Sequence, residues 1–141
     1  MFDDIRENDK PARRLRILVT EDDVVSQKLA MMILKKMGHE VVIAENGKVA
    51  VAQLQKSRFD LVLMDIHMPE MDGYAATEAI RRWESLRGSH TPIIAVTANT
   101  MTADRNRCLK KGMDGYLAKP ITTEAVARAI QFAFAMIAEH G

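Results

Sequence analysis

The sequence has little cysteine, almost no net charge and no long apolar run, and each shortage excludes a class of protein. Its only cysteine, Cys108, cannot form an internal disulfide, which favours a reducing compartment. The formal net charge of +1 gives no indication of a nucleic-acid or membrane-surface partner. No apolar stretch approaches the ~20 residues of a membrane span, and no signal-peptide pattern opens the chain. We therefore expect a cytoplasmic protein that binds neither a membrane nor, directly, nucleic acid.

What the sequence does contain is typical of one globular domain. The chain has 141 residues, of which 48% are hydrophobic, enough to form a single substantial core. Residues 1–14 are charged, include Pro11 and lack apolar periodicity, so they are predicted to be a flexible leader or linker. The domain itself is expected over residues 15–141.

Within the domain, short apolar runs alternate with helical patterns. Continuous apolar runs of this length are typical of strands buried on both faces of a parallel sheet, and such strands need crossover helices. The pattern predicts an α/β fold, a five-stranded parallel sheet with helices on both faces and flavodoxin-like strand order 2-1-3-4-5. The predicted strands are Arg16–Thr20, Glu40–Ala44, Asp60–Met64, Pro92–Val96 and Gly115–Ala118. The predicted helices run from about Val24 to Met37, from the Asn46-Gly47 turn to about Lys56, from the loop that ends at Gly73 to about Leu86, from near Met101 to Lys111, and roughly from Thr123 to Glu139.

Reactive polar residues follow four of these apolar runs: Glu21, Asp22, Asp65, Thr97 and Lys119. The carboxyl ends of parallel strands line one crevice, so these side chains are expected to meet there. Adjacent carboxylates repel unless a cation is bound, and all-oxygen ligands favour Mg²⁺, while no His or Cys spacing suggests zinc. A hydroxyl and an ammonium donate to phosphoryl oxygens. The pattern predicts a metal-assisted phosphate site, with Asp23 as the N-cap of the following helix.

The same residues, in order, carry a family resemblance. Glu21-Asp22, Asp65 followed by Met68-Pro69 and Asp72-Gly73, Thr97-Ala98, and Tyr116 before Lys119-Pro120 resemble the receiver domains of two-component response regulators. The match runs from Arg16 to the end of the chain. Within that family, the residues of these motifs are similar to those of receivers attached to hybrid histidine kinases and phosphorelays.

The resemblance implies a phosphoacceptor rather than an enzyme in the usual sense. Asp65 would take a phosphoryl group from the phosphohistidine of a histidine kinase or a histidine phosphotransfer domain. Asp22, Asp65 and the backbone carbonyl of His67 would bind Mg²⁺, with Glu21 acting mainly through water. Thr97 and Lys119 would hold the phosphoryl oxygens.

The resemblance also implies residues that regulate the site. Thr97 and Tyr116 would form the switch that changes the partner-binding surface after phosphorylation. His67 and Asn99 would tune the lifetime of the phosphoryl group, because the family varies these positions and they control water access.

The first helix carries an apolar stripe of Ala30, Ile33, Leu34 and Met37 for the core. That stripe leaves Val25, Met31 and Met32 for docking a partner, although such side chains can also pack against loops. The last helix carries a second stripe, from Val126 to Ile137. Trp83 is expected in the core.

Three alternatives stay open on the residues alone. A haloacid-dehalogenase-type phosphatase would need a second Asp at the position of His67, and a flavodoxin-like cofactor protein would need Ser, Thr and Gly where Glu21 to Asp23 stand. A receiver kept only for protein binding would not need all five site residues. The domain is expected to be a monomer or a weak phosphorylation-dependent dimer, with a slight preference for a fragment of a hybrid kinase. Its kinase, stimulus and output are not indicated.

Overall fold

A computed structural model describes residues 14–98 and 101–140, and within them strands and helices alternate as the sequence predicts. The strands are β1 (Arg16–Thr20), β2 (Glu40–Ala44), β3 (Leu61–Asp65), β4 (Ile93–Thr97) and β5 (Gly115–Ala118). The helices are α2 (Val24–Lys36), α3 (Gly47–Lys56), α4 (Gly73–Ser85), α5 (Thr102–Lys110) and α6 (Thr123–His140). The predicted bounds differ from these by at most one or two residues, the usual uncertainty at element ends.

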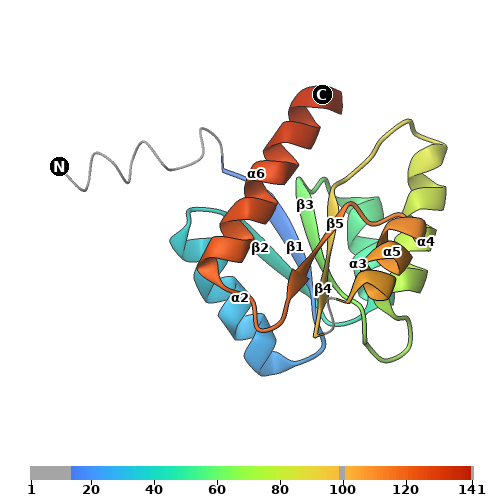
Figure 1. Ribbon diagram of the computed structural model, residues 1–141. Helices are drawn as coiled ribbons and strands as arrows, with labels where there is room; N and C mark the ends of the chain where they lie inside the picture. Colours follow the sequence, from blue (N-terminus) through green and yellow to red (C-terminus); the bar gives the residue numbers. More distant parts are fainter. Residues whose placement is uncertain (1–13, 99–100, 141) are drawn as a thin grey trace.

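All neighbouring strands pair in parallel, and the order is β2-β1-β3-β4-β5, so the predicted fold class is confirmed. Figure 1 shows α2 and α6 on one side of the sheet and α3, α4 and α5 on the other. Parallel strands that are covered on both sides bury side chains on both faces, which explains the uninterrupted apolar runs of β3 and β4.

Each side of the sheet has its own core. Ile17, Leu63 and Val96 face α2 and α6, where the predicted helix stripes lie. Ala30, Ile33 and Leu34 are buried there, and Met37 packs against them from the helix end. In α6 the stripe from Val126 to Ala133 is buried, with Ile137 partly covered. Both predicted stripes are confirmed.

Helix ends follow from local chemistry. The side chains of Asp23, Asn46 and Asp72 accept hydrogen bonds from the third backbone N–H that follows each of them, at 2.8 to 2.9 Å. The hydrogen bond from the Ser26 N–H holds the pKa of the Asp23 carboxyl below its usual value. Gly38 and Gly112 follow the ends of α2 and α5 with φ of 93° and 102°, the left-handed conformation that glycine adopts without strain.

The prediction for Trp83 was wrong. Its side chain is only half-buried and lies beneath the guanidinium of Arg87, 4.5 Å from the ring centroid. The buried residue of that helical turn is instead Glu84, which is 2% exposed. A search for apolar periodicity places every carboxylate on the solvent-facing side of a helix. It does not detect Arg81, whose guanidinium pairs with Glu84 and compensates for the burial of this carboxylate.

Candidate functional site

The five predicted site residues meet at the carboxyl ends of the strands. Asp65 is the last residue of β3 and Thr97 the last of β4, while Glu21 and Asp22 follow β1, and Lys119 follows β5. The register aligns these strand ends, since Asp65 pairs with Val96 and Thr97 with Ala118. Parallel pairing therefore gathers residues that are up to 98 positions apart in the sequence into one cleft.

Three carboxylates form the acidic part of the site. Oxygen atoms of Glu21, Asp22 and Asp65 all lie within 4.8 Å of one another. Asp65 and Glu21 are 3% and 5% exposed, whereas Asp22 is open to solvent. Buried carboxylates at this separation repel each other strongly unless a cation lies among them.

Among the described residues, Lys119 is the one cationic side chain that forms ion pairs with these carboxylates. Its Nζ lies 3.0 Å from Asp65 Oδ2 and 3.2 Å from Glu21 Oε1. Burial by itself lowers the pKa of Lys119, but the hydrogen bonds and charges of Asp65 and Glu21 outweigh it. The net result is a pKa above the ordinary lysine value. The ammonium therefore stays charged at neutral pH, and the backbone holds its base, because Lys119 N–H donates to Thr97 O at 2.9 Å.

The surrounding backbone fixes the two buried carboxylates. The N–H of His67 donates to Asp65 Oδ1 at 3.3 Å, and the N–H of Asp23 donates to Glu21 Oε2 at 3.1 Å. Gln27 reaches back from α2 and donates to Glu21 O at 2.7 Å. Such bonds preorganise acceptor groups before any ligand arrives.

Gly73, which follows Asp72 in the motif behind Asp65, supports the site in a way that its sequence context does not reveal. A Cβ at this position would collide with the carbonyl oxygen of Asp65, and the Gly73 N–H donates to Ile66 O at 2.9 Å. The start of α4 is thus packed directly on the backbone of Asp65. In the sequence, Gly73 is separated from Asp65 by eight positions, so nothing local indicates this contact.

The donor set fits a hard divalent cation. Three carboxylates face a single ammonium, so the cluster keeps negative charge that an additional cation would neutralise. Oxygen ligands in this number suit Mg²⁺, which commonly uses one or two carboxylates with waters and a phosphate oxygen.

The remaining predicted positions are less closely joined to this cluster. His67 is exposed and follows Asp65 by two residues. Tyr116 is half-buried on β5, with the guanidinium of Arg105 lying 4.8 Å from its ring centroid. Asn99 lies outside the described residues. On α2, Val25 and Met32 are 75% and 62% exposed, whereas Met31 is half-buried.

Comparison with known proteins agrees with this geometry. The family model described as the response regulator receiver domain matches residues 17–131. This chain belongs to the receiver domain family. Its fold is similar to that of the Vibrio cholerae chemotaxis protein CheY4, with a TM-score of 0.78 and 28% identity over 86% of this chain and 99% of that one.

Two relatives connect the chain to sensor kinases. The sensor protein GacS of Pseudomonas syringae pv. syringae is 45% identical over 120 residues, which cover 84% of this chain and 13% of that protein. The crystal structure of the receiver domain of the Pseudomonas aeruginosa sensor histidine kinase PA1611 has a magnesium ion coordinated in its active-site cleft. It is 38% identical, with a TM-score of 0.78, over 87% of this chain and 99% of that one. Relatives such as GacS are thus much longer than this chain, which spans only 13% of the length of GacS.

A third relative shows a receiver with a partner. The receiver domain of Saccharomyces cerevisiae Ssk1, solved in complex with the histidine phosphotransfer protein Ypd1, is 27% identical with a TM-score of 0.83. The match covers 87% of this chain and 90% of that one. The chain is therefore a receiver domain of two-component and phosphorelay signalling. Among the described residues, no helix of this receiver is long and apolar enough to cross a membrane.

Proposed function

We propose that Asp65 is the phosphoacceptor of this receiver. The observation that carries the proposal is the placement of Asp65: it is a buried carboxylate at a strand end, hydrogen-bonded to the His67 N–H and paired with Lys119. A carboxylate oxygen of Asp65 attacks phosphorus, the bond from phosphorus to the donor's imidazole nitrogen breaks, and an acyl phosphate forms. The electron pair of the broken bond returns to the imidazole ring.

The neighbouring side chains have separate roles in this reaction. The Lys119 ammonium and the Thr97 hydroxyl donate to the oxygens of the transferring phosphoryl group, whose negative charge they stabilise. Glu21, Asp22, Asp65 and the His67 carbonyl would hold Mg²⁺, which when bound offsets the charge of the phosphoryl oxygens. Positioning and charge stabilisation account for most of the catalysis in phosphoryl transfer, so no separate acid or base is required.

Incubation with acetyl phosphate tests the proposal. Wild-type protein with Mg²⁺ is expected to give a retarded band on a phosphate-affinity gel, and the band should be absent without Mg²⁺ and in Asp65→Asn. Asp104→Asn, which removes a carboxylate on α5, is the matched control and should behave as wild type. A retarded band in Asp65→Asn would assign the phosphoacceptor to another residue.

We further propose that phosphorylation is read through Thr97 and Tyr116, while His67 and Asn99 set the lifetime of the acyl phosphate. Thr97 is buried beside the acceptor, and Tyr116 lies on the neighbouring strand with its ring against Arg105. Substitution of His67 is expected to change the half-life of phospho-Asp65 without abolishing its formation. Unchanged decay in His67→Ala and Asn99→Ala would contradict the assignment.

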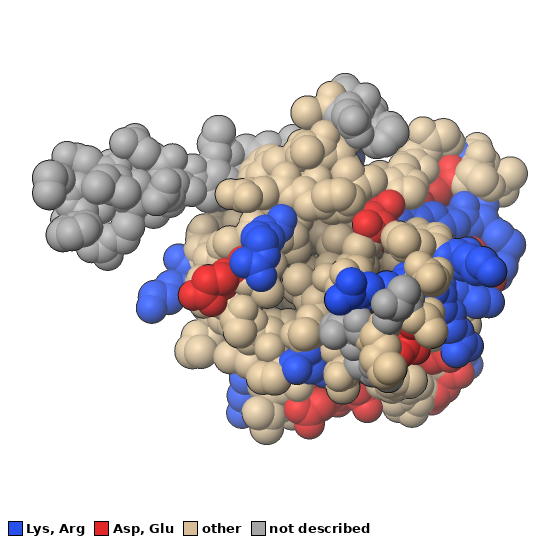
Figure 2. Space-filling view, viewed as in Figure 1, with Lys and Arg blue, Asp and Glu red and all other residues tan. Residues whose placement is uncertain are grey.

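The histidine-bearing partner is proposed to dock on α2 through Val25, Met31 and Met32. Exposed apolar side chains gather there beside the cleft, whereas Figure 2 shows Lys and Arg gathered over α4 and α5. Met32→Glu is expected to slow phosphotransfer from a phosphorylated histidine phosphotransfer protein about ten-fold, a typical effect at a contact worth more than 1 kcal/mol. Its reaction with acetyl phosphate should not change. Leu109→Glu, at an exposed apolar residue of α5, is the control.

A further inference from the structure

A large groove lies at the end of the sheet opposite to the phosphoacceptor. It has a volume of about 1030 Å³, and its walls come from the end of α3, the start of β3, the segment between α4 and β4, and the last turns of α6. Figure 1 shows that the chain also enters β1 at this end of the sheet. Nothing in the phosphoryl chemistry proposed above uses this groove.

The groove combines apolar and cationic side chains. Phe59, Trp83, Met136 and Ile137 contribute apolar surface. Lys56 and Arg58 are exposed at its edge, and neither forms an ion pair with a carboxylate within the described ranges. The lining therefore favours a ligand that carries both apolar and negatively charged groups.

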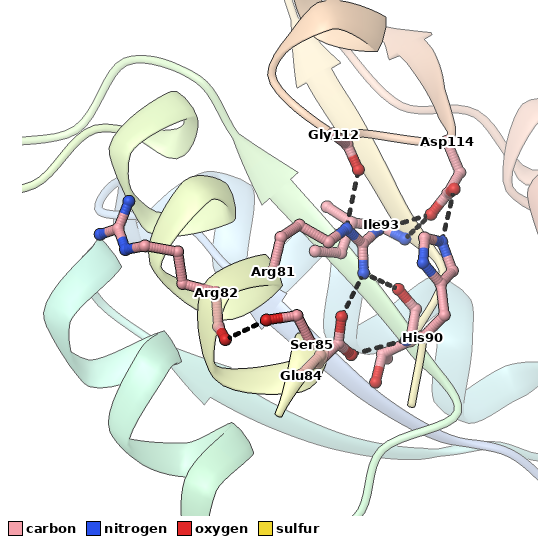
Figure 3. Close-up of polar contacts among 9 residues, drawn as sticks. Arg81, Arg82, Glu84, Ser85, His90, Ile93, Gly112 and Asp114 are labelled. Carbon is pink, nitrogen blue, oxygen red and sulfur yellow. Dashed lines mark hydrogen bonds and ion pairs between the residues drawn. The ribbon is translucent and has the colours of Figure 1, made fainter. Parts of the chain in front are cut away.

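One wall of the groove is held rigidly from behind. Figure 3 shows Arg81 of α4 at the centre of a cluster with Glu84 and Asp114. Arg81 Nη1 donates to Thr91 O at 2.8 Å, and the Thr91 N–H donates to Glu84 Oε2 at 2.7 Å. His90, on the same wall, lies 2.8 Å from Asp114 Oδ1. A wall tied at successive residues is preformed, which lowers the entropic cost of binding.

The first nine residues of this chain have the matching chemistry. Their sequence, Met-Phe-Asp-Asp-Ile-Arg-Glu-Asn-Asp, contains four carboxylates against one arginine, together with Phe2 and Ile5. Opposite charge and paired apolar groups make this segment complementary to the groove.

The point where this segment joins the domain lies at the edge of the groove. The Arg16 N–H donates to Asp60 Oδ2 at 2.8 Å, and Arg16 Nη1 donates to Arg58 O at 3.2 Å. The Arg16 guanidinium also lies over the Phe59 ring, 4.5 Å from its centroid. Residues 10–13 span up to about 13 Å when extended, which is enough to bring residues 1–9 to the groove.

We propose that this groove is a docking site for the acidic segment 1–9 of the same chain. The segment would be bound at the amino ends of β3 and β4, leaving the phosphoacceptor cleft and α2 open to partners.

Trp83 makes the proposal measurable, because it is the only tryptophan of the chain and lines the groove. In the full chain, Asp3→Lys with Asp4→Lys is expected to increase acrylamide quenching of Trp83 fluorescence and to shift its indole N–H resonance. The docked fraction should fall by a factor of about two or more, as for the loss of exposed ion pairs. Arg58→Glu should have the same effect, and combining it with the two lysine substitutions should restore part of the wild-type signal. Lys28→Glu on α2, an exposed lysine outside the groove, is the matched control.

Two results would overturn the proposal. The first is a Trp83 signal that is the same in wild type and in the Asp3→Lys, Asp4→Lys variant at low salt. The second is a difference that disappears on dilution, because the groove would then be occupied by the segment of a second copy.

Discussion

The two charged clusters of this receiver, at opposite ends of the sheet, differ in how completely their charges are matched. Around Arg81, two carboxylates share one guanidinium, and four of its five N–H groups donate to Gly112 O, Thr91 O, Glu84 and Asp114 at 2.6 to 2.8 Å. Around Asp65, three carboxylates share one ammonium. With His90 neutral, the first cluster has one negative charge in excess, and the second has two.

The difference separates a structural role from a chemical one. A largely buried ion pair that is hydrogen-bonded on several sides holds neighbouring elements in one arrangement, here α4 and the amino ends of β4 and β5. A buried cluster with unbalanced charge binds cations and responds to added groups, as functional sites commonly do. The excess of negative charge, rather than burial, distinguishes the two.

The largest effect on this comparison is expected from removing the single cation of the acidic cluster. Lys119→Met should slow formation of phospho-Asp65 about 100-fold, as expected for loss of one donor to a developing charge. The same substitution should tighten Mg²⁺ binding, since the carboxylates then lack their ammonium. Stopped-flow phosphorylation with acetyl phosphate and calorimetric titration with MgCl₂ measure the two effects.

Lys110→Met, at an exposed lysine of α5, is the control and should change neither quantity. Weaker Mg²⁺ binding in Lys119→Met would mean that the lysine does not compete with the metal for the carboxylates.

The Arg81 cluster should respond in stability instead. Arg81→Met leaves the buried Glu84 carboxylate without its charged partner, and we expect the free energy of unfolding to fall by about 3 kcal/mol, at the lower end for a broken buried pair. Arg82→Met, at the exposed neighbour that points away from the cluster in Figure 3, should change it by less than about 0.5 kcal/mol. Urea denaturation of both variants gives the values.

The phosphorylation rate of folded Arg81→Met protein should equal that of wild type. A selective loss of phosphorylation with unchanged stability would show that this cluster belongs to the chemistry after all.

A smaller effect on stability is expected from His39, which is a buried titratable group with only one hydrogen-bond partner among the described residues. Its Nδ1 accepts from the Leu15 N–H at 3.0 Å, and its Nε2 has no hydrogen-bond partner among the residues that the structure describes. Burial, with a smaller contribution from Arg14, lowers the pKa of His39 below 6.5. The unfolded chain therefore takes up a proton first, and stability is lost as the pH falls from about 6.5 towards the folded-state pKa.

Denaturation at pH 7.5 and pH 5.5 measures this loss. Wild type should lose more stability between the two values than His39→Asn, which keeps an acceptor near Nδ1 but does not titrate. Equal losses would show that the other histidines account for the pH dependence.

The sequence predicted the sheet and the acidic cleft because both depend on short-range signals. Apolar runs identify strands such as β3. Parallel pairing then brings the carboxyl ends of the strands together, whatever the sequences of the connecting loops. The Arg81 cluster was not predicted because Arg81 of α4 pairs with Asp114, which is 33 residues away in the sequence. No local sequence pattern indicates that pairing. The misplacement of Trp83 has the same cause, since the buried Glu84 depends on this distant partner.

The most direct test of the central assignment is to trap the acyl phosphate chemically. Protein treated with acetyl phosphate and Mg²⁺, then reduced with borohydride, converts a phosphorylated aspartate to homoserine, which peptide mass spectrometry locates. We expect homoserine at position 65 and at no other aspartate. Homoserine at position 22, or at no aspartate while the gel still shows a phosphorylated band, would contradict it.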